Sequence, residues 1–238
     1  MTCSERPRRV RRCWHLSENC FSRSLRRPTW WSISRAVTDW TISTFARAGA
    51  RAVVGVDFSE VTASAAKRRA EEMDLNVRYV LADCTRVGLR GKVADLVYTG
   101  KGALMWLPDL DAWATEVARL LRPGGQLFLY EAHPAACLWS RDVDQVRIEP
   151  GRSYFAETRV NDTFPASAID RFAPGARLDA VEWQWTFADI LNAVTTAGLE
   201  LRHLGEYPEP FWRATGQAIP AWTGRLPNSF SLLARRVP

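Results

Sequence analysis

The sequence has little cysteine and no long apolar run. Five cysteines occur among 238 residues, and no two of them form a Cys-x-x-Cys pair. An odd and sparse set argues against a disulfide framework and favours a reducing compartment, so we expect a cytoplasmic protein. No apolar stretch approaches the roughly 20 residues that cross a bilayer, so we expect neither a transmembrane helix nor a membrane partner.

The first 48 residues contain no glycine, and the first glycine of the chain is Gly49. No apolar run is followed by G-x-G-x-x-G, the fingerprint of many dinucleotide-binding sites. This absence counts against a nicotinamide-dependent oxidoreductase.

The net positive charge comes from one end of the sequence. Residues 1–38 contain nine arginines against Glu5 and Glu18, whereas the chain from Asp39 onward sums to −1, although the whole carries +6. The chain from Asp39 onward therefore lacks the net positive charge that favours binding of nucleic acid in a groove, and we expect no nucleic-acid partner.

Residues 1–38 show neither a helical nor a strand period, and we expect an irregular, poorly ordered basic leader. A secretory signal is excluded by the lack of an apolar centre, and the tryptophans and cysteines fit a transit peptide poorly. Cys13, His15 and Cys20 lack a fourth ligand at a familiar spacing, so we expect no metal site.

Apolar runs of strand length alternate with helical patterns from Asp39 onward. The expected strands are residues 52–57, 76–81, 94–98, 126–130, 199–204 and 229–234. The expected helices are residues 39–50, 60–73, a segment from Pro108-Asp109 to the Arg122-Pro123-Gly124-Gly125 stop, and a segment from Thr186 to Gly198. This alternation predicts βαβ units and a parallel sheet.

Two acids follow neighbouring strands in the sequence. Asp57 ends the first apolar run, and Asp83-Cys84 follows the second. Ligands bind at the carboxyl ends of strands in open α/β sheets, and an ionised carboxylate can accept both hydroxyls of a ribose. Alternatively, Asp57 only ends a strand before the Ser59 helix cap, and Asp83 only forms an Asx turn.

Four segments in this order and spacing resemble the class I S-adenosylmethionine-dependent methyltransferases. They are Val-Val-Gly-Val-Asp-Phe-Ser (53–59), Ala-Asp-Cys (82–84), Ala-Leu-Met-Trp-Leu-Pro-Asp-Leu (103–110) and Leu-Leu-Arg-Pro-Gly-Gly (120–125). The resemblance implies S-adenosyl-L-methionine as cofactor, with its ribose at Asp57 beside Phe58 and its adenine at Asp83 and Cys84. It also implies that the loop after the next strand, with Tyr98, Thr99 and Gly100, lies against the cofactor.

The resemblance implies a Rossmann-like α/β three-layer sandwich, with a mostly parallel seven-stranded sheet whose last strand is antiparallel. Residues 39–238 would form the methyltransferase domain, with an aromatic cap, or an irregular satellite core, at about 135–185. The family's glycine-rich loop should fall near residues 35–39, where no glycine occurs. We therefore expect a first strand that is missing or poorly formed, and a leader that resembles out-of-frame translation.

The expected activity is methyl transfer to a small-molecule acceptor beneath the aromatic cap. His133 follows the expected strand at 126–130 and is the candidate catalytic base, the alternative being a structural or substrate-packing role. The alternative for the whole chain is a catalytically impaired protein that binds cofactor weakly or not at all, because the glycine-rich loop is absent. A nucleic-acid methyltransferase is disfavoured by the slightly acidic body.

Overall fold

The structure is a computed structural model that describes residues 29–33, 42, 45–47, 49–139, 146–161, 180–210 and 224–237. Of residues 29–33, 161 and 180, only the backbone is described. The main strands are β1 (Thr29–Ile33), β2 (Ala52–Asp57), β3 (Val77–Leu81), β4 (Ala94–Gly100), β5 (Leu121–Ala132), β8 (Leu199–Tyr207) and β9 (Ser229–Arg236). The helices are α3 (Glu60–Glu72), α4 (Leu110–Leu120) and α6 (Phe187–Thr196), with short 3-10 helices η1 (Leu104–Trp106) and η2 (Pro134–Cys137).

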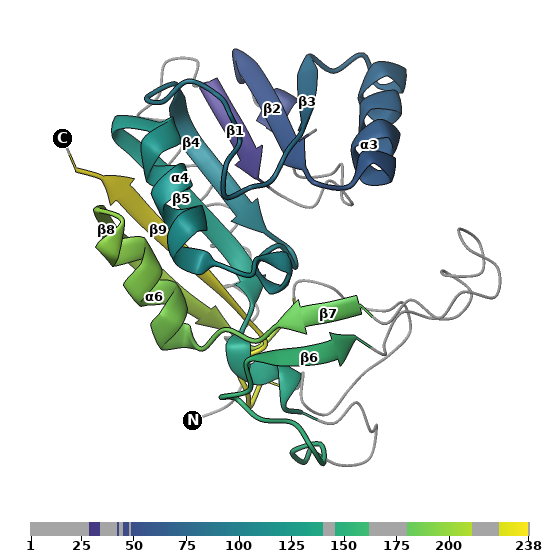
Figure 1. The fold of residues 1–238 in the computed structure, drawn as a ribbon, viewed down its shortest axis with the longest axis vertical. Helices are drawn as coiled ribbons and strands as arrows, with labels where there is room; N and C mark the ends of the chain where they lie inside the picture. The colour runs from purple at the N-terminus through teal and green to yellow at the C-terminus, as the bar shows by residue number, and fades with distance from the viewer. Residues whose placement is uncertain are drawn as a thin grey trace, which may run out of the picture.

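These strands form one seven-stranded sheet in the order β3-β2-β1-β4-β5-β9-β8 (Figure 1). Strands β1 to β5 pair in parallel, whereas β9 runs antiparallel to both β5 and β8. The expected mixed sheet with an antiparallel final strand is therefore confirmed. Because β1 to β5 are parallel, their carboxyl ends meet at one edge of the sheet.

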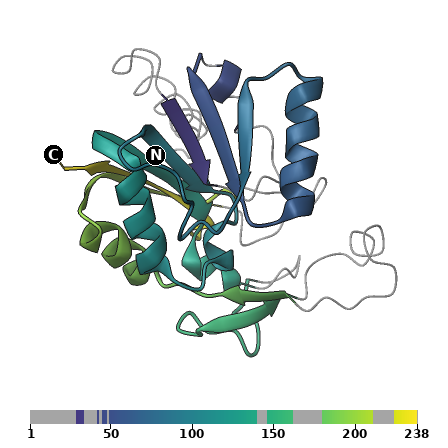
Figure 2. The same ribbon diagram turned by 45° about the horizontal axis from the view of Figure 1, so that its top comes forward.

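Helices lie against both faces of the sheet. Helices α4 and α6 lie side by side over β4, β5 and β9, in front of the sheet in Figure 1 and still together in Figure 2. Trp113 of α4 and Val194 of α6 are fully buried there with Leu127 of β5. The opposite face is covered by helical residues 42 and 45–47, where Ile42 packs with Val53 and Leu96. The predicted three-layer fold is confirmed.

Local signals placed most elements correctly. Ser59 caps α3 by accepting a hydrogen bond from the Thr62 N–H, and Thr186 forms a reciprocal capping box with Asp189 at the start of α6. Gly198 follows α6 with a φ of +78°, the left-handed conformation that glycine adopts at helix ends.

The expectation of a missing or poorly formed first strand is corrected by β1. Its register pairs Thr29 with Ala52 of β2 and Trp30 with Leu96 of β4, so β1 lies inside the sheet between these two strands. It also lies inside the segment expected to be an irregular leader. The rest of that segment and residues 35–39 fall outside the described residues, so their order remains a prediction.

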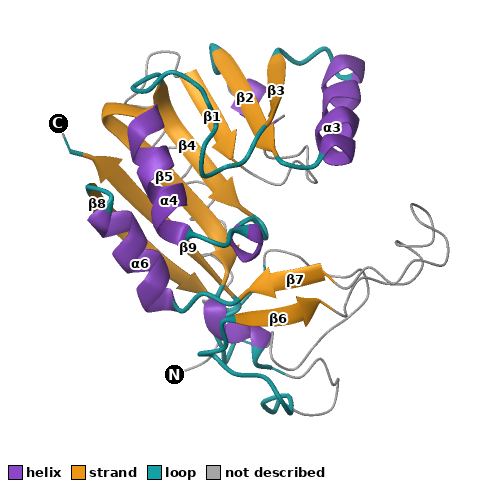
Figure 3. Cartoon of the chain, in the orientation of Figure 1, coloured by secondary structure: helices purple, strands orange, loops and turns teal. Residues whose placement is uncertain are grey.

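The region expected to form a cap contains a second, two-stranded sheet. Strand β6 (Thr158–Asn161) pairs antiparallel with β7 (Ala180–Trp183). This hairpin lies beyond the carboxyl ends of β4 and β5 (Figures 1 and 3), and β7 packs against η1. Among the described residues, none of the helices is both long and apolar enough to cross a membrane.

Candidate functional site

The two predicted acids lie on adjacent strand ends at the same edge of the sheet. Asp57 is the last residue of β2, opposite Leu81 of β3, and its carbonyl accepts a hydrogen bond from the Ala82 N–H at 3.0 Å. Asp57 is buried, and its Oδ1 accepts from the Ser59 N–H at 2.7 Å. The first turn after β2 therefore fixes the direction of this carboxylate.

Asp83 is exposed and forms the Asx turn that the sequence left open as an alternative. Its Oδ1 accepts hydrogen bonds from the N–H and the hydroxyl of Thr85, both at 2.8 Å. Both bonds end on the same oxygen, so Oδ2 still presents lone pairs to a ligand. The turn orients the carboxylate and is compatible with a binding role.

Cys84 joins the two acids into one site. Burial, and then the negative charges of Asp57 and Asp83, raise the pKa of its thiol to about 12. Both carboxylates therefore act on the same sulfur atom, which stays protonated at neutral pH and is unsuited to nucleophilic chemistry. Phe58 beside them is 57% exposed and Leu81 is 55% exposed, so large apolar side chains flank the acids.

The end of β4 contributes three predicted residues with different environments. Tyr98 is buried, with its ring 5.6 Å from that of Phe45 and 6.0 Å from that of Phe128, so it packs in the core. A Cβ at Gly100 would lie 2.4 Å from the Tyr130 carbonyl oxygen, so glycine is needed there for packing between strands. Thr99 is fully buried, and its hydroxyl has no hydrogen-bond partner among the residues that the structure describes, so it is a polar group suited to a ligand.

The turn after β4 is anchored by Glu131 of β5, a residue to which sequence reasoning gave no role. Its Oε2 accepts from the Gly102 N–H at 2.7 Å, and its Oε1 accepts from the N–H groups of Ala103 and Leu104 at 2.7 and 3.3 Å. Burial raises the pKa of Glu131 to about 7, and these hydrogen bonds oppose the rise. The available sequence signal was an acid at the end of an apolar strand.

His133, the candidate base, has both ring nitrogens engaged. Nδ1 accepts from the Ala135 N–H at 3.1 Å, which caps η2, and Nε2 lies 2.9 Å from a carboxylate oxygen of Glu206. The ring also packs against Phe187 and Phe230. Burial lowers the His133 pKa, while Glu206 opposes this change. This arrangement favours the structural alternative over a role in proton abstraction.

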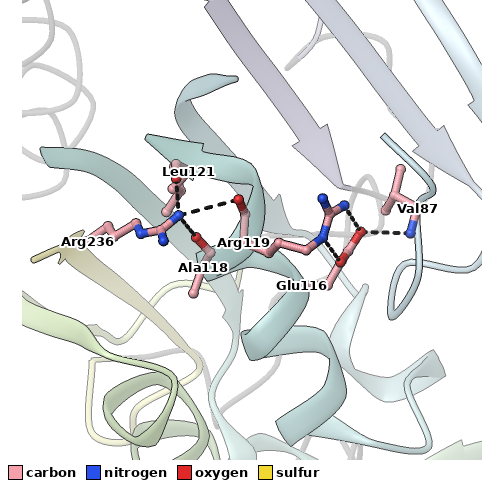
Figure 4. A network of polar contacts seen from close by, with 6 residues as sticks. All are labelled: Val87, Glu116, Ala118, Arg119, Leu121 and Arg236. Carbon is pink, nitrogen blue, oxygen red and sulfur yellow. Dashed lines mark hydrogen bonds and ion pairs between the residues drawn. The ribbon is translucent and has the colours of Figure 1, made fainter. Parts of the chain in front are cut away.

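A polar network connects α4 to the loop that carries Asp83 (Figure 4). Glu116 accepts from the Val87 N–H at 2.9 Å and binds Arg119 through two hydrogen bonds of 2.7 Å. The Arg119 guanidinium lowers the Glu116 pKa. Arg236 donates to the carbonyls at the end of the same helix. The loop after β3 is therefore held to a buried helix.

The cap hairpin is tied to the same edge of the sheet. The Trp185 indole N–H donates to the Leu107 carbonyl at 3.2 Å, and the Gln184 side chain donates to the Pro134 carbonyl at 3.2 Å. Among the described residues, no group of three or more potential ligands could hold a metal ion. Cys13, His15 and Cys20 lie outside the described residues.

Comparison with known proteins agrees with this geometry. Residues 37–129 match the sequence model of a family described as "Methyltransferase domain". A demethylmenaquinone methyltransferase from Staphylococcus saprophyticus is 36% identical over 94 residues, which cover 39% of this chain. The matched region spans only 40% of that relative's length.

Solved structures match over most of the chain. An S-adenosylmethionine-dependent methyltransferase from Mesorhizobium loti has a TM-score of 0.65 at 22% identity, covering 92% of this chain and 96% of its own. The geranyl diphosphate C-methyltransferase of Streptomyces coelicolor has a TM-score of 0.62 at 16% identity, and the match covers 97% of this chain and 82% of that enzyme. The sequence-based recognition is thus confirmed at the level of the fold: this chain has the class I S-adenosylmethionine-dependent methyltransferase fold, and residues 37–129 match a methyltransferase domain.

Proposed function

We propose that this protein is an S-adenosylmethionine-dependent methyltransferase that acts on a small-molecule acceptor. The observation that supports this most directly is the placement of Asp57 at the end of β2 and of Asp83 two residues after the adjacent strand β3, where both carboxylates raise the pKa of the Cys84 thiol. Two carboxylates in this arrangement suit a single nucleoside, one accepting from its sugar and the other from its base.

The surrounding residues fit the rest of this cofactor. Phe58 and Leu81 offer exposed apolar surface beside the acids, where a purine ring would be covered. The unpartnered Thr99 hydroxyl offers a hydrogen bond at the end of the central strand β4. We assign Asp57 to the ribose, Asp83 and Cys84 to the adenine, and Thr99 to the part of the cofactor nearest the centre of the sheet. Tyr98 and Gly100 shape this strand end through packing.

The cofactor supplies a methyl group activated by its sulfonium, and the protein supplies alignment and exclusion of water. We place the acceptor near the end of β4, on the side of the sheet where β6 and β7 lie (Figures 1 and 3). We assign His133 a structural role there, since Ala135 and Glu206 engage both of its nitrogens.

A small-molecule acceptor with an apolar part is favoured by the names of two similar proteins, which concern demethylmenaquinone and geranyl diphosphate. The net charge of −1 from Asp39 onward gives no support for a nucleic-acid substrate. We propose that the protein acts in the cytoplasm, in keeping with its few cysteines.

The competing proposal is an impaired methyltransferase-fold protein that binds the cofactor weakly or not at all. It is motivated by the lack of any glycine before Gly49, where the family places its glycine-rich loop. The presence of β1 between β2 and β4 weakens this rival, because the strand that should precede that loop is formed.

Calorimetry with S-adenosylhomocysteine separates the two proposals. We expect the full chain to bind, and binding to be lost in Asp57→Ala. The matched control is Asp95→Ala, which removes another buried aspartate, one that pairs with Arg122 near the opposite end of β4. Absence of binding to the intact chain would favour the impaired protein, and binding of NADH instead would indicate an oxidoreductase.

A further inference from the structure

The turn from Gly100 to Leu104 is held by one buried side chain. Three consecutive N–H groups, those of Gly102, Ala103 and Leu104, donate to the two carboxylate oxygens of Glu131. Twenty-seven to 29 residues separate the donors from the acceptor, so this contact joins two neighbouring strands beyond their ends. The Lys101 N–H donates to the Tyr130 carbonyl at 2.8 Å and closes the same junction.

Burying a carboxylate is costly unless hydrogen bonds replace the lost water. Glu131 is 3% exposed, and the three hydrogen bonds that hold its carboxylate come from the turn. The hydrogen bonds from the turn N–H groups therefore offset the cost of burying an ionised Glu131. Conversely, an ionised Glu131 is what organises these N–H groups.

The turn also has an unfavourable backbone conformation. Lys101 has a φ of +59° and Gly102 has a φ of +92°, so two successive residues are left-handed. A lysine in this region is disfavoured and persists only where surrounding contacts impose it. The Glu131 carboxylate, bound to the next three N–H groups, provides such contacts.

The anchored turn belongs to the candidate site. It begins directly after Thr99, whose buried hydroxyl has no partner, and it leads into η1, on which the cap strand β7 packs. Its Lys101 lies between these two parts, and burial lowers the pKa of that amine. Any shift of the turn would therefore move the cofactor side and the acceptor side of the site together.

We propose that Glu131 is a positioning residue, whose carboxylate fixes the Gly100–Leu104 turn and thereby sets the places of Thr99 and Lys101 at the cofactor site. This inference rests on the proposed function, because it takes this edge of the sheet to be that site. Glu131 acts through backbone groups and need not touch the cofactor or the acceptor.

The proposal predicts a pH dependence. Protonation turns one carboxylate oxygen into a hydroxyl, which is a donor and a weaker acceptor, so the turn N–H groups are held less firmly when Glu131 binds a proton. The titratable groups nearest to Glu131 along the elements around it are Lys101 in the turn, His133 further along the chain and Glu206 of β8, which faces His133. Phe230 of β9, paired with Glu131, contributes no charge.

The first test follows the amide signals of Gly102 and Ala103 by ¹⁵N NMR on the full chain from pH 5 to 9. We expect both signals to shift together with a midpoint near 7, and this transition to vanish in Glu131→Gln. The matched control is Glu116→Gln, which also alters a buried acid bound to a loop N–H; it should leave the transition in place. Signals that do not titrate, or that titrate equally in Glu131→Gln, would overturn the proposal.

The second test is calorimetry with S-adenosylhomocysteine at pH 7 in buffers of different ionisation enthalpy. Because a bound ligand favours the ordered turn, binding should release protons from Glu131 in the wild type and none in Glu131→Gln, with affinity at least tenfold lower in that variant. Equal affinity and equal proton release in both proteins would refute the positioning role. If the wild type fails to bind, the proposed function fails, and the amide titration alone decides whether Glu131 holds the turn.

Discussion

Glu131 should make the folding stability depend on pH in a direction opposite to that of most acids. Raising a carboxyl pKa from 4.5 to about 7 corresponds to about 3 kcal/mol of folding free energy. The folded state binds the proton more tightly than the unfolded state. The stabilisation is therefore complete below pH 4.5 and is lost as the pH rises through 7.

The assay is urea unfolding of wild type and Glu131→Gln at pH 5 and at pH 8. Other groups titrate alike in both proteins, so the difference between their unfolding free energies isolates Glu131. We expect the wild type to lose about 2–3 kcal/mol relative to Glu131→Gln between the two pH values.

The control, Glu116→Gln, should show no such change. The Glu116 pKa is lowered by Arg119, so its contribution is present above its unfolded pKa and is lost only as the pH falls below about 4.5. A difference between wild type and Glu131→Gln that stays constant within about 0.5 kcal/mol from pH 5 to 8 would refute the reasoning.

Three further variants test the packing around the site. Gly100→Ala should lower the unfolding free energy by about 1–3 kcal/mol, because its Cβ would overlap the Tyr130 carbonyl oxygen; chemical denaturation measures this, and an unchanged midpoint would contradict it. Glu116→Ala should cost about 1–3 kcal/mol and speed hydrogen exchange at the Val87 amide, whereas unchanged exchange would show that this bond does not hold the loop. His133→Gln should lower the unfolding free energy by about 1–2 kcal/mol but keep the affinity for S-adenosylhomocysteine within about twofold. A tenfold loss of affinity would show that His133 contributes to cofactor binding.

Most elements of the fold could be predicted from local patterns. Strand β2 and helix α3 were recognised from an apolar run followed by a capping serine, and both are present with almost the expected bounds. Strand β1 was not recognised. A central parallel strand is normally a continuous apolar run, whereas Thr29–Ile33 includes a threonine and a serine. Its position is set by pairing with β2 and β4, which local sequence does not report.

The sequence predicted the positions of two acids, because acids at strand ends follow from the sequence once a parallel sheet is inferred. Asp57 ends β2 and Asp83 follows the adjacent strand β3, and their role in cofactor binding stays a prediction. The role of Glu131 was not identified, because its partners are backbone N–H groups, which leave no side-chain pattern to detect. Tyr98 was assigned to the cofactor from its place in the loop, but β4 extends to Gly100 and directs this ring into the core.

The central claim is that Asp57 and Asp83 bind one nucleoside, and S-adenosylhomocysteine binding by two single variants tests it most directly. A hydrogen bond to a charged group contributes about 1.5–3 kcal/mol, so Asp57→Asn and Asp83→Asn should each weaken binding by at least tenfold. Adenosine alone should show the same losses, because both contacts lie on the nucleoside. Wild-type affinity in either single variant, for either ligand, would contradict the claim.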